Sequence, residues 1–578
     1  MKLSDYIAQF LYNNKISTVF GYQGGNIAHF IDSINKQNNI DFVSTYNEQG
    51  ASYAACSYSL VSDNLGAALA SSGPGAINLL SGIANAFYDS IPCIFFTGNV
   101  SAHTIKTNEN IRQNAFQEND IVSMVQKITK YAVTVKRPEE IRFHLEKALF
   151  LAKSGRPGPV LLDLPHNVQK AEIIPEKLNS YSSIVEDDLP DKSSIDRIIE
   201  IVKAAKKPLI LAGGGLIDQF TRKLFNRLLD VWRIPVVTTL RGLDVISHKS
   251  DLFAGFGGAY GNRSANLAVY NSDVLIVLGS RLDERFIATS NKDVFMNKQI
   301  IHVDIDKYEL GRIFLDEITI NSNLSMFLKA LLDRINSKIN CSKWISTINQ
   351  WKIRYSSIDT MNIYNINNII RKITENCDDN AIYTGDVGLN LMCLAQSAMI
   401  VQNQRIYTSS GLGAMGCSLP LAIGAAYATN KRNKILCFVG DGGLHMNIQE
   451  LLLIKKENLP IHVILLNNNC LGMIRDFQAK AFKSTFIGTV KEFQTVDYEA
   501  IAKAYGLPYK RVTRESELND SVEFVNSVES GFIEFVLPED TNTNPLLGKD
   551  MFCELPELSA KENLLIQKEV TECENTIY

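Results

Sequence analysis

The 578-residue chain lacks the features that mark several protein classes. It has no run near the ~18 consecutive apolar residues of a membrane-spanning helix, so we expect no membrane partner. Its start has no basic stretch followed by an apolar core, so we expect no signal peptide. It also lacks a charge excess, because 58 Lys and Arg oppose 62 Asp and Glu. That balance argues against a nucleic-acid partner and leaves small anionic substrates open.

Paired cysteine motifs are absent as well. The ten cysteines are scattered and none forms a C-x-x-C pair, so we expect neither a zinc site nor a redox motif. Several lie within apolar runs, such as Cys437 in 435–439. We therefore expect small buried hydrophobes in a reducing, cytoplasmic environment.

The chain is rich in alternating structural signals. Short β-branched apolar runs alternate with amphipathic stretches over most of the length, which predicts βαβ units and parallel sheets. Polar passages near 179–194 and 325–362 separate three blocks. We place the blocks at 1–172, 190–335 and 362–545, followed by a surface tail at 546–578.

The run 435–470 is the most informative segment. A predicted strand, 435–439, leads into the turn 440–443, which contains Gly-Asp-Gly-Gly. After a helix and a Leu-Pro break, a second strand at 461–466 ends in Asn-Asn-Asn-Cys. This is one βαβ unit, so both polar clusters lie at carboxyl ends of parallel strands, where α/β sheets bind ligands.

These two clusters predict a cation site beside a phosphate site. If the strands are neighbours, Asp441 and Asn468 can reach one ion, and their oxygens suit Mg²⁺ or Ca²⁺. The glycines leave backbone amides free for a phosphate. A tight glycine turn beside an asparagine-rich loop, with no ligand, is the alternative. The 27-residue separation of the clusters favours a diphosphate held through Mg²⁺.

Gly440-Asp441-Gly442 followed by Asn467-Asn468 resembles the motif of thiamine-diphosphate (ThDP) enzymes. The resemblance implies that Asp441, Asn468 and the backbone oxygen of Cys470 bind the metal. It also implies that His445 and the amides of Gly442 and Gly443 lie at the diphosphate.

ThDP chemistry also needs a carboxylate at the aminopyrimidine of the coenzyme, because the protein sets the tautomer of that ring. Glu48 follows the apolar run 40–46 and precedes a helix rich in small residues. We expect it to be largely desolvated and to serve as that carboxylate. Taken alone, it would be interpreted as a solvated acid at a helix start.

Further motifs resemble acetolactate synthase-like enzymes over nearly the whole chain. They are Gly21-Tyr22-Gln23-Gly24-Gly25, Asn47-Glu48-Gln49-Gly50-Ala51, Ser72-Gly73-Pro74-Gly75-Ala76, Asp89-Ser90-Ile91-Pro92, Ala115-Phe116-Gln117-Glu118, Gly155-Arg156-Pro157-Gly158-Pro159-Val160 and Gly411-Leu412-Gly413-Ala414-Met415-Gly416. The resemblance implies three doubly wound α/β domains: a pyrimidine-binding domain, a Rossmann-like middle domain and a diphosphate-binding domain.

By this resemblance Glu48 is the activating acid, Gln117 lies near the thiazolium and substrate, and Gly25 lies near the reacting oxygen. Met415 becomes the apolar prop of the bent coenzyme, although an ordinary core role is the alternative for Met415 and Met473. The other implied ThDP contacts are Pro74, Asn78, Val387, Gly388, Gly413, Gly442, Gly443 and His445.

The middle block resembles the FAD-binding domain of acetolactate synthases through 279–285 and 301–306. The implied FAD contacts are Arg156, Gly213, Gly214, Thr239, Leu240, Arg281 and Asp304. The alternative is a structural domain without ligand. Ile320-Asn321 stands where the family usually has Gly-Asp, which counts against FAD. Such a flavin has no redox role in carboligation.

The resemblance implies decarboxylation of a 2-oxoacid, pyruvate being favoured, and transfer of the two-carbon unit to an acceptor carbonyl. Arg285 matches the arginine that holds the acceptor carboxylate; a salt bridge to Asp283 or a flavin phosphate is the alternative. Phe116 joins the substrate site. Phe477 and His166 stand where Trp and Lys are usual, and Leu389-Asn390 and Ala259-Tyr260 replace Gln-His and Met-His.

These departures suggest an altered or larger acceptor. The segments 261–263, 279–283 and 473–478 look closer to a polysaccharide-cluster branch of yersiniose-type enzymes, which use a nucleotide-linked keto sugar. We lean towards that acceptor over a second 2-oxoacid. A simple decarboxylase and a non-catalytic paralogue are further alternatives. The resemblance also implies a homodimer or homotetramer, because the two halves of such sites normally come from different chains.

Overall fold

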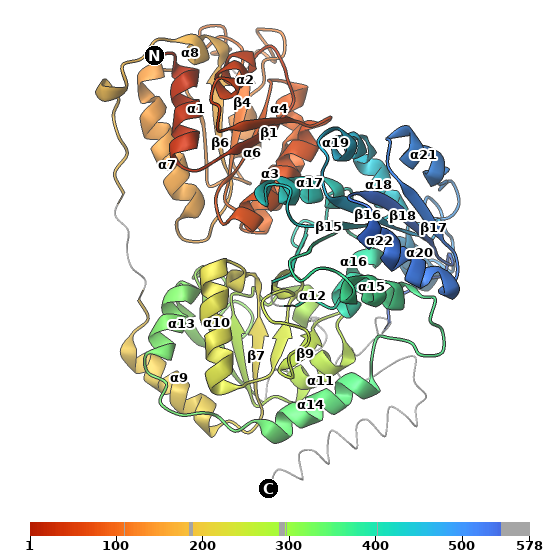
Figure 1. Cartoon of the computed structure of the whole chain (residues 1–578). Helices are drawn as coiled ribbons and strands as arrows, with labels where there is room; N and C mark the ends of the chain where they lie inside the picture. Colours follow the sequence, from red (N-terminus) through yellow and green to blue (C-terminus); the bar gives the residue numbers. More distant parts are fainter. Residues whose placement is uncertain (109, 184–188, 288–294, 296–297, 402, 545–578) are drawn as a thin grey trace.

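The computed structural model describes residues 1–108, 110–183, 189–287, 295, 298–401 and 403–544. They form three α/β units, each built on a six-stranded, wholly parallel sheet flanked by helices (Figure 1). The predicted α/β fold with three parallel-sheet domains is therefore confirmed. The tail predicted at 546–578 lies outside the described residues. Within the described ranges, no helix combines the length and apolar character needed to cross a membrane.

The first unit, red to orange in Figure 1, has the strand order β2-β1-β3-β4-β6-β5. Its strands are β1 (Thr18–Gly21), β2 (Asp41–Ser44), β3 (Gly66–Ala70), β4 (Cys93–Asn99), β5 (Tyr131–Thr134) and β6 (Val160–Pro165). Its helices are α1 (Leu3–Asn13), α2 (Ala28–Asn35), α3 (Glu48–Ser62), α4 (Pro74–Asn78), α5 (Leu80–Tyr88), α6 (Ile121–Val125), α7 (Ile141–Lys153) and α8 (His166–Lys170).

The middle unit, yellow to green, has the order β12-β11-β10-β7-β8-β9. Its strands are β7 (Pro208–Ala212), β8 (Val236–Thr238), β9 (Phe253–Phe256), β10 (Val274–Leu278), β11 (Gln299–Asp304) and β12 (Ile318–Asn321). Its helices are α9 (Lys192–Ala204), α10 (Gln219–Trp232), α11 (Arg263–Asn271), α12 (Glu284–Ile287), α13 (Leu324–Leu332) and α14 (Ser342–Arg354).

The third unit, green to blue, has the order β14-β13-β15-β16-β18-β17. Its strands are β13 (Ile382–Gly385), β14 (Arg405–Thr408), β15 (Ile435–Gly440), β16 (Ile461–Asn467), β17 (Tyr509–Val512) and β18 (Gly531–Val536). Its helices are α15 (Ile366–Glu375), α16 (Leu389–Ser397), α17 (Ser418–Ala428), α18 (Asp441–Met446), α19 (Leu451–Lys456), α20 (Gly472–Ala481), α21 (Tyr498–Ala504) and α22 (Leu518–Ser527).

The central strands are continuous apolar runs because helices cover both faces of each sheet. In β15 the five residues from Ile435 to Val439 are at most 1% exposed, including Cys437. The eight cysteines in the described ranges are unpaired, and seven of them are buried. The expectation that cysteine acts here as a small buried hydrophobe is confirmed for those seven.

In each sheet the chain crosses from one side of the unit's first strand to the other: between β1 and β3, between β7 and β10, and between β13 and β15. At such a point the flanking connections leave towards opposite faces and open a crevice at the carboxyl ends of the strands. The fold therefore provides three crevices, and the residues that follow these strands decide what each can bind.

The first and third units share one continuous apolar core, centred on the pair α3 and α17 (Figure 1). A Cβ added to Gly424 of α17 would lie 2.0 Å from the backbone oxygen of Ala54 in α3, so the helices approach closely only through small residues. Phe20 and Tyr427 pack edge to face with ring centroids 5.8 Å apart. This packing fixes the start of α3 relative to the third unit.

Candidate active site

Asp441 and Asn468 follow two neighbouring strands of the third sheet. β15 and β16 pair in parallel, with Gly440 opposite Leu466. Asp441 is the first residue of α18, and Asn468 comes directly after β16. Both side chains therefore start from the same edge of the sheet, as the βαβ interpretation requires.

The side-chain carboxylate of Asp441 is suited to bind a cation. It is 2% exposed, and its Oδ1 accepts a hydrogen bond from the amide of Gly442 at 2.8 Å. Its Oδ2 is buried without a hydrogen-bond partner among the described residues. Burial raises the pKa of Asp441 to about 6, although the amides of Gly442, Asn469 and Cys470 partly offset the rise. An unpartnered buried carboxylate oxygen fits a bound cation.

The residues beside Asp441 offer oxygen atoms as metal ligands. The side-chain nitrogen of Asn468 donates to the sulfur of Cys470 at 3.2 Å, which leaves its carbonyl oxygen as the ligand atom. Burial raises the pKa of the Cys470 thiol to about 12, so the neutral sulfur is a poor ligand and the backbone oxygen is the better one. The described residues contain no cluster of three His, Cys, Asp or Glu side chains placed to hold a metal. A hard cation such as Mg²⁺ fits this set.

Gly442 and Gly443 form a cradle that only glycine permits. A Cβ on Gly442 would lie 2.3 Å from Cδ2 of Leu471, and one on Gly443 would lie 2.4 Å from Oδ1 of Asp386. Leu471 and Asp386 therefore pack directly against these two glycines, which are both buried. His445, on the same short helix, lies 3.2 Å from the hydroxyl of Tyr498 through its Nε2.

Among the other predicted coenzyme residues, Met415 lies against the glycine turn. Val387 and Gly388 come after β13, and Gly388 has a φ of 127°. Gly413 has a φ of 72°, which favours glycine at that turn. The Cε of Met415 lies 3.4 Å from the Cβ position of Gly442, and Met473 lies half-buried in α20.

Asp386 is a site residue that sequence reasoning missed. It is fully buried, and its two oxygens accept hydrogen bonds from the amides of Gly416 at 2.9 Å and Ser418 at 3.0 Å. Burial raises its pKa to about 6. Asp386 thereby joins the end of β13 to the loop that carries Met415. Its position directly before Val387 at a strand end was the available signal.

The first unit carries Glu48 at the start of α3. Oε2 of Glu48 accepts a hydrogen bond from the side-chain amide of Asn78 at 3.0 Å. Pro74 and Asn78 are the first and last residues of α4, so both lie near this carboxylate. The expectation of a largely desolvated Glu48 is wrong for the single chain, where the residue is only half-buried. Its surroundings in one chain are open to solvent.

The remaining predicted residues of the first unit have different local surroundings. Gln117 has a φ of 64° and its Cβ lies 3.2 Å from the Cβ position of Gly73, just before α4. A Cβ on Gly25 would meet no described atom within 4 Å. Phe116 is 85% exposed. His166 lies at the start of α8, with its Nδ1 3.3 Å from the hydroxyl of Ser101.

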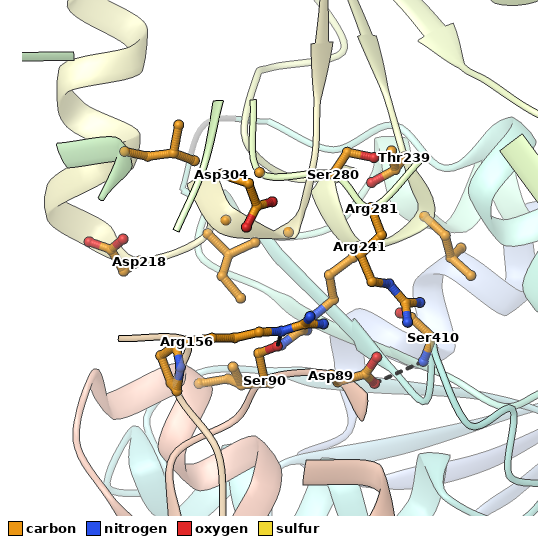
Figure 2. Close-up of a pocket in the computed structure, with 18 of the residues that line it drawn as sticks. Asp89, Ser90, Arg156, Asp218, Thr239, Arg241, Ser280, Arg281, Asp304 and Ser410 are labelled. Carbon is orange, nitrogen blue, oxygen red and sulfur yellow. Dashed lines mark hydrogen bonds between the residues drawn. The ribbon is translucent and has the colours of Figure 1, made fainter. Parts of the chain in front are cut away.

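A separate cavity of about 600 Å³ lies between the three units (Figure 2). It opens at the crevice of the middle sheet, where the residues after β7 and β10 meet. The predicted FAD and acceptor residues that line it are Arg156, Gly214, Thr239, Leu240, Arg281, Arg285 and Asp304. Gly213 is not among the lining residues; it packs beside the cavity, since its Cβ position is 2.2 Å from the backbone oxygen of Gly279.

One predicted arginine, Arg156, and one unpredicted arginine, Arg241, both line this cavity. Arg156 is held by Asp306 and Glu309, each at 3.0 Å, so its charge is already matched and it is a weak phosphate ligand. Arg241, which we did not predict, has Nε and one terminal nitrogen buried without a partner in the described part of the chain. Unpartnered buried donors fit an anionic group, so the cavity suits a phosphate-bearing ligand such as FAD. Asp283 pairs with Arg281 at 3.7 Å.

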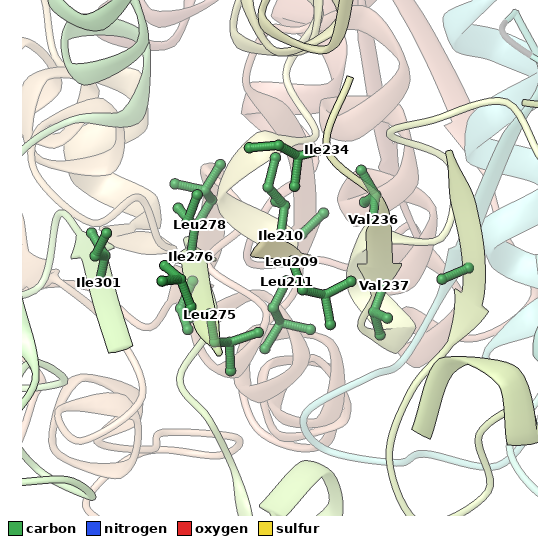
Figure 3. Close-up of a cluster of buried hydrophobic side chains, with 14 of the residues drawn as sticks. Leu209, Ile210, Leu211, Ile234, Val236, Val237, Leu275, Ile276, Leu278 and Ile301 are labelled. Carbon is green, nitrogen blue, oxygen red and sulfur yellow. The ribbon is translucent and has the colours of Figure 1, made fainter. Parts of the chain in front are cut away.

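The cavity stands on a rigid apolar sheet (Figure 3). Leu209, Ile210 and Leu211 of β7 lie between Val236 and Val237 of β8 and the side chains of β10, and these β7 and β8 residues are all 0% exposed. Close packing of this kind keeps the loops at the strand ends in place. Asp304, at the end of β11, is 7% exposed, and burial raises its pKa.

The fold and these two crevices fit an α/β enzyme with a phosphate-bearing coenzyme and a divalent cation. Comparison with family models agrees. The chain matches the "Thiamine pyrophosphate enzyme, N-terminal TPP binding domain" over 1–124, the corresponding "central domain" over 195–331 and the "C-terminal TPP binding domain" over 386–534.

Individual relatives cover almost the whole chain. The acetolactate synthase large subunit of Lactococcus lactis is 32% identical over 94% of this chain and 94% of its own length. A probable acetolactate synthase large subunit of Methanococcus aeolicus is 32% identical over 90% of each chain. The chloroplastic acetolactate synthase of Arabidopsis thaliana is 32% identical over 94% of this chain and 83% of its own. The chain belongs to the ThDP-dependent acetolactate synthase-like family of carboligases.

Proposed function

We propose that this protein decarboxylates pyruvate and joins the remaining two-carbon unit to an acceptor carbonyl, using ThDP and Mg²⁺. The observations that support this best are the buried Oδ2 of Asp441, which has no partner among the described residues, and the Gly442–Gly443 turn at the start of α18. A divalent cation and a diphosphate satisfy both features at once.

The bound coenzyme supplies the nucleophilic carbon and the electron sink for decarboxylation. Asp441, Asn468 and the backbone oxygen of Cys470 hold the cation. Glu48 keeps a proton on the pyrimidine ring, and Gln117 orients the substrate. Met415 supplies an apolar wall that excludes water from one side of the coenzyme.

The first candidate for the acceptor is a second 2-oxoacid. The names of the relatives, acetolactate synthases, support it. Arg285 lines the cavity beside the middle sheet and supplies a guanidinium suited to a carboxylate.

The second candidate is a nucleotide-linked keto sugar. It is favoured by two exposed aromatic side chains, Phe116 at 85% and Phe477 at 56%, and by His166 in place of a lysine. Aromatic side chains of this kind can pack against a sugar or base, whereas a small oxoacid would leave them in water.

We further propose that FAD occupies the cavity of the middle unit in a structural role. Arg241 and Arg281 would hold its diphosphate, and Asp304 would accept from a hydroxyl group. The unpartnered nitrogens of Arg241 support this assignment.

We also propose a homodimer, or a homotetramer built from dimers. Within the described chain, no hydrogen bond joins Glu48 to Asp441 or Asn468, and Glu48 remains half-buried. Met446 and Ile474, beside the cation crevice, are 55% and 51% exposed. A second copy that brings its Glu48 edge to this crevice would cover both surfaces.

Incubation of the protein with pyruvate, ThDP and Mg²⁺ tests the proposal. Release of CO₂ with acetolactate supports the 2-oxoacid acceptor. A branched product formed only with a nucleotide keto sugar supports the second candidate. Acetaldehyde alone identifies a simple decarboxylase, and no CO₂ with any acceptor contradicts catalysis altogether.

A further inference from the structure

Glu450 is a buried acid that none of the proposed chemistry uses. It ends the short helix Ile448–Glu450, between α18 and α19, and it is 0% exposed. It lies nine residues after Asp441, in the same segment that forms the cation crevice. No positively charged side chain pairs with it in the ranges that the structure describes, although a buried carboxylate is costly without such a partner.

The contacts of Glu450 cross to the first unit. Its Oε1 accepts hydrogen bonds from the backbone amides of Tyr46 and Asn47, each at 3.0 Å. These two residues directly precede Glu48. The carboxyl group therefore holds the two peptide units that lead into the activating acid. Its Oε2 is buried and has no partner among the described atoms.

A second contact supports the same turn. The side chain of Asn447 donates to Oε1 of Gln49 at 3.3 Å and to the backbone oxygen of Gly416 at 2.8 Å. The backbone amide of Gln49 in turn donates a hydrogen bond to Oδ1 of Asn47 at 2.8 Å. The loop that carries Met415 and the start of α3 are thus joined through one asparagine.

The surrounding residues are shaped to admit Glu450. A Cβ on Gly50 would lie 2.7 Å from Oε1 of Glu450, so glycine is needed there for the carboxyl group to reach the turn. Burial raises the pKa of Glu450 to about 7. Both protonation states can still accept from the two amides through Oε1.

We propose that Glu450 is a positioning residue. It holds the turn Tyr46–Asn47, and through this turn it keeps Glu48 in the position needed to act on the coenzyme. This inference rests on the proposed function of Glu48. Small displacements of a catalytic group reduce its rate strongly, so a turn held by two hydrogen bonds matters more for turnover than for binding.

Amide hydrogen exchange of the coenzyme-free protein tests the contact itself. In Glu450→Ala the amides of Tyr46 and Asn47 should exchange about 10- to 100-fold faster than in the wild type, because both lose their acceptor. In Glu450→Gln they should stay within about 3-fold, because the amide oxygen can replace Oε1. Unchanged exchange in Glu450→Ala overturns the proposal.

A second measurement follows the proton at C2 of bound ThDP, whose exchange with D₂O reports coenzyme activation without turnover. Glu450→Ala should slow this exchange and kcat together by about 10- to 100-fold, with KM and the ThDP dissociation constant within about 3-fold. Glu450→Gln should restore most of both rates. A Gln variant as slow as the Ala variant, or a loss confined to ThDP affinity, contradicts the proposal.

Asp244→Asn provides a matched control. Asp244 is 3% exposed and also crosses a domain boundary, accepting from the side chain of Arg405 at 2.6 Å and the amide of Ile406 at 3.2 Å. The Asp244→Asn variant should destabilise the fold without changing amide exchange at Tyr46 and Asn47. If it speeds this exchange as much as Glu450→Ala does, the effect is general and the proposal fails. Absence of CO₂ release by the wild type would refute the proposed function instead, while the amide exchange would still report the contact.

Discussion

The crevices of the middle and third units both lie at the carboxyl ends of parallel strands but present opposite chemistry. In the third unit, Asp441 and Asn468 place oxygen atoms at the strand ends, one of them unpartnered. In the middle unit, Arg241 and Arg281 place positive charge there, with two unpartnered nitrogens on Arg241. The strand order therefore determines where a ligand binds, and a few side chains determine its charge.

The two sites also differ in whether one chain supplies all of their residues. Asp441 is almost fully buried in one chain, whereas Glu48, which would complete the same site, is half-buried and accepts a hydrogen bond from Asn78. The cavity of the middle unit is lined by residues of all three units of one chain. We therefore expect the flavin cavity to form in a monomer and the ThDP site to require a second copy.

The largest effect should come from Asp441→Ala. Loss of the only carboxylate proposed to bind the cation should lower turnover by on the order of 10³-fold or more and remove Mg²⁺-dependent ThDP binding. Isothermal titration with ThDP and Mg²⁺ measures the binding. Asp520→Ala, an exposed carboxylate of the same unit, is the control. Retention of FAD by Asp441→Ala would show that the two crevices bind their ligands independently. Loss of both cofactors would show that the two crevices depend on each other.

Glu48→Gln should reduce turnover by about 10²- to 10⁴-fold, because an amide cannot keep the pyrimidine ring protonated. ThDP and Mg²⁺ should bind as in the wild type, since the cation crevice is intact. Steady-state kinetics and titration together check this, with Glu139→Gln as a surface control. A turnover number close to that of the wild type would refute the role of Glu48.

Arg241→Met should weaken FAD about 10- to 100-fold and leave ThDP affinity unchanged, because it removes the unpartnered donors of the middle crevice alone. Flavin absorbance near ~450 nm after gel filtration measures retention. Arg227→Met, on the exposed side of α10, should retain flavin like the wild type. Equal flavin content in all three proteins would exclude Arg241 as a ligand.

The smallest effect concerns the stability of the coenzyme-free protein. The pKa of Glu450 is about 7 in the folded state against an ordinary 4.5, so between these values the native state binds a proton that the unfolded state lacks. The free energy of unfolding should therefore fall as pH rises through this window. Glu450→Gln cannot ionise and should exceed the wild type by on the order of 2 kcal/mol at pH 8 but match it near pH 4.5. Thermal unfolding at both pH values measures the difference; an equal gain at both would contradict the assignment.

Much of the fold was predictable because the signals are local. The apolar runs of β15 and β16, with the Gly-Asp-Gly turn between β15 and α18, are sufficient to predict the parallel pairing of these strands. The general α/β class followed from the same alternation along the whole chain. The clustering of Asp441 and Asn468 needed only the rule that parallel strands share their carboxyl edge.

Contacts between segments distant in the sequence were not predictable in this way. Asp386 was missed because its partners, Gly416 and Ser418, lie thirty residues and more away. Arg156 was predicted as a FAD contact, and nothing in the sequence shows that Asp306 and Glu309 also reach it. Arg241 directly follows the predicted residue Leu240 but was not itself predicted. Only the folded chain shows that two of its side-chain nitrogens are buried without a partner among the described residues.

The sequence by itself determined the three parallel sheets and the chemistry that follows each strand, because strand periodicity and turn residues act over a few positions. The tertiary structure decided which groups face each other: Glu450 against the turn before Glu48, Arg241 in the cavity, and Glu48 half-buried at an open edge. Burial and hydrogen-bond partners come from elements brought together only by packing, so no local pattern encodes them.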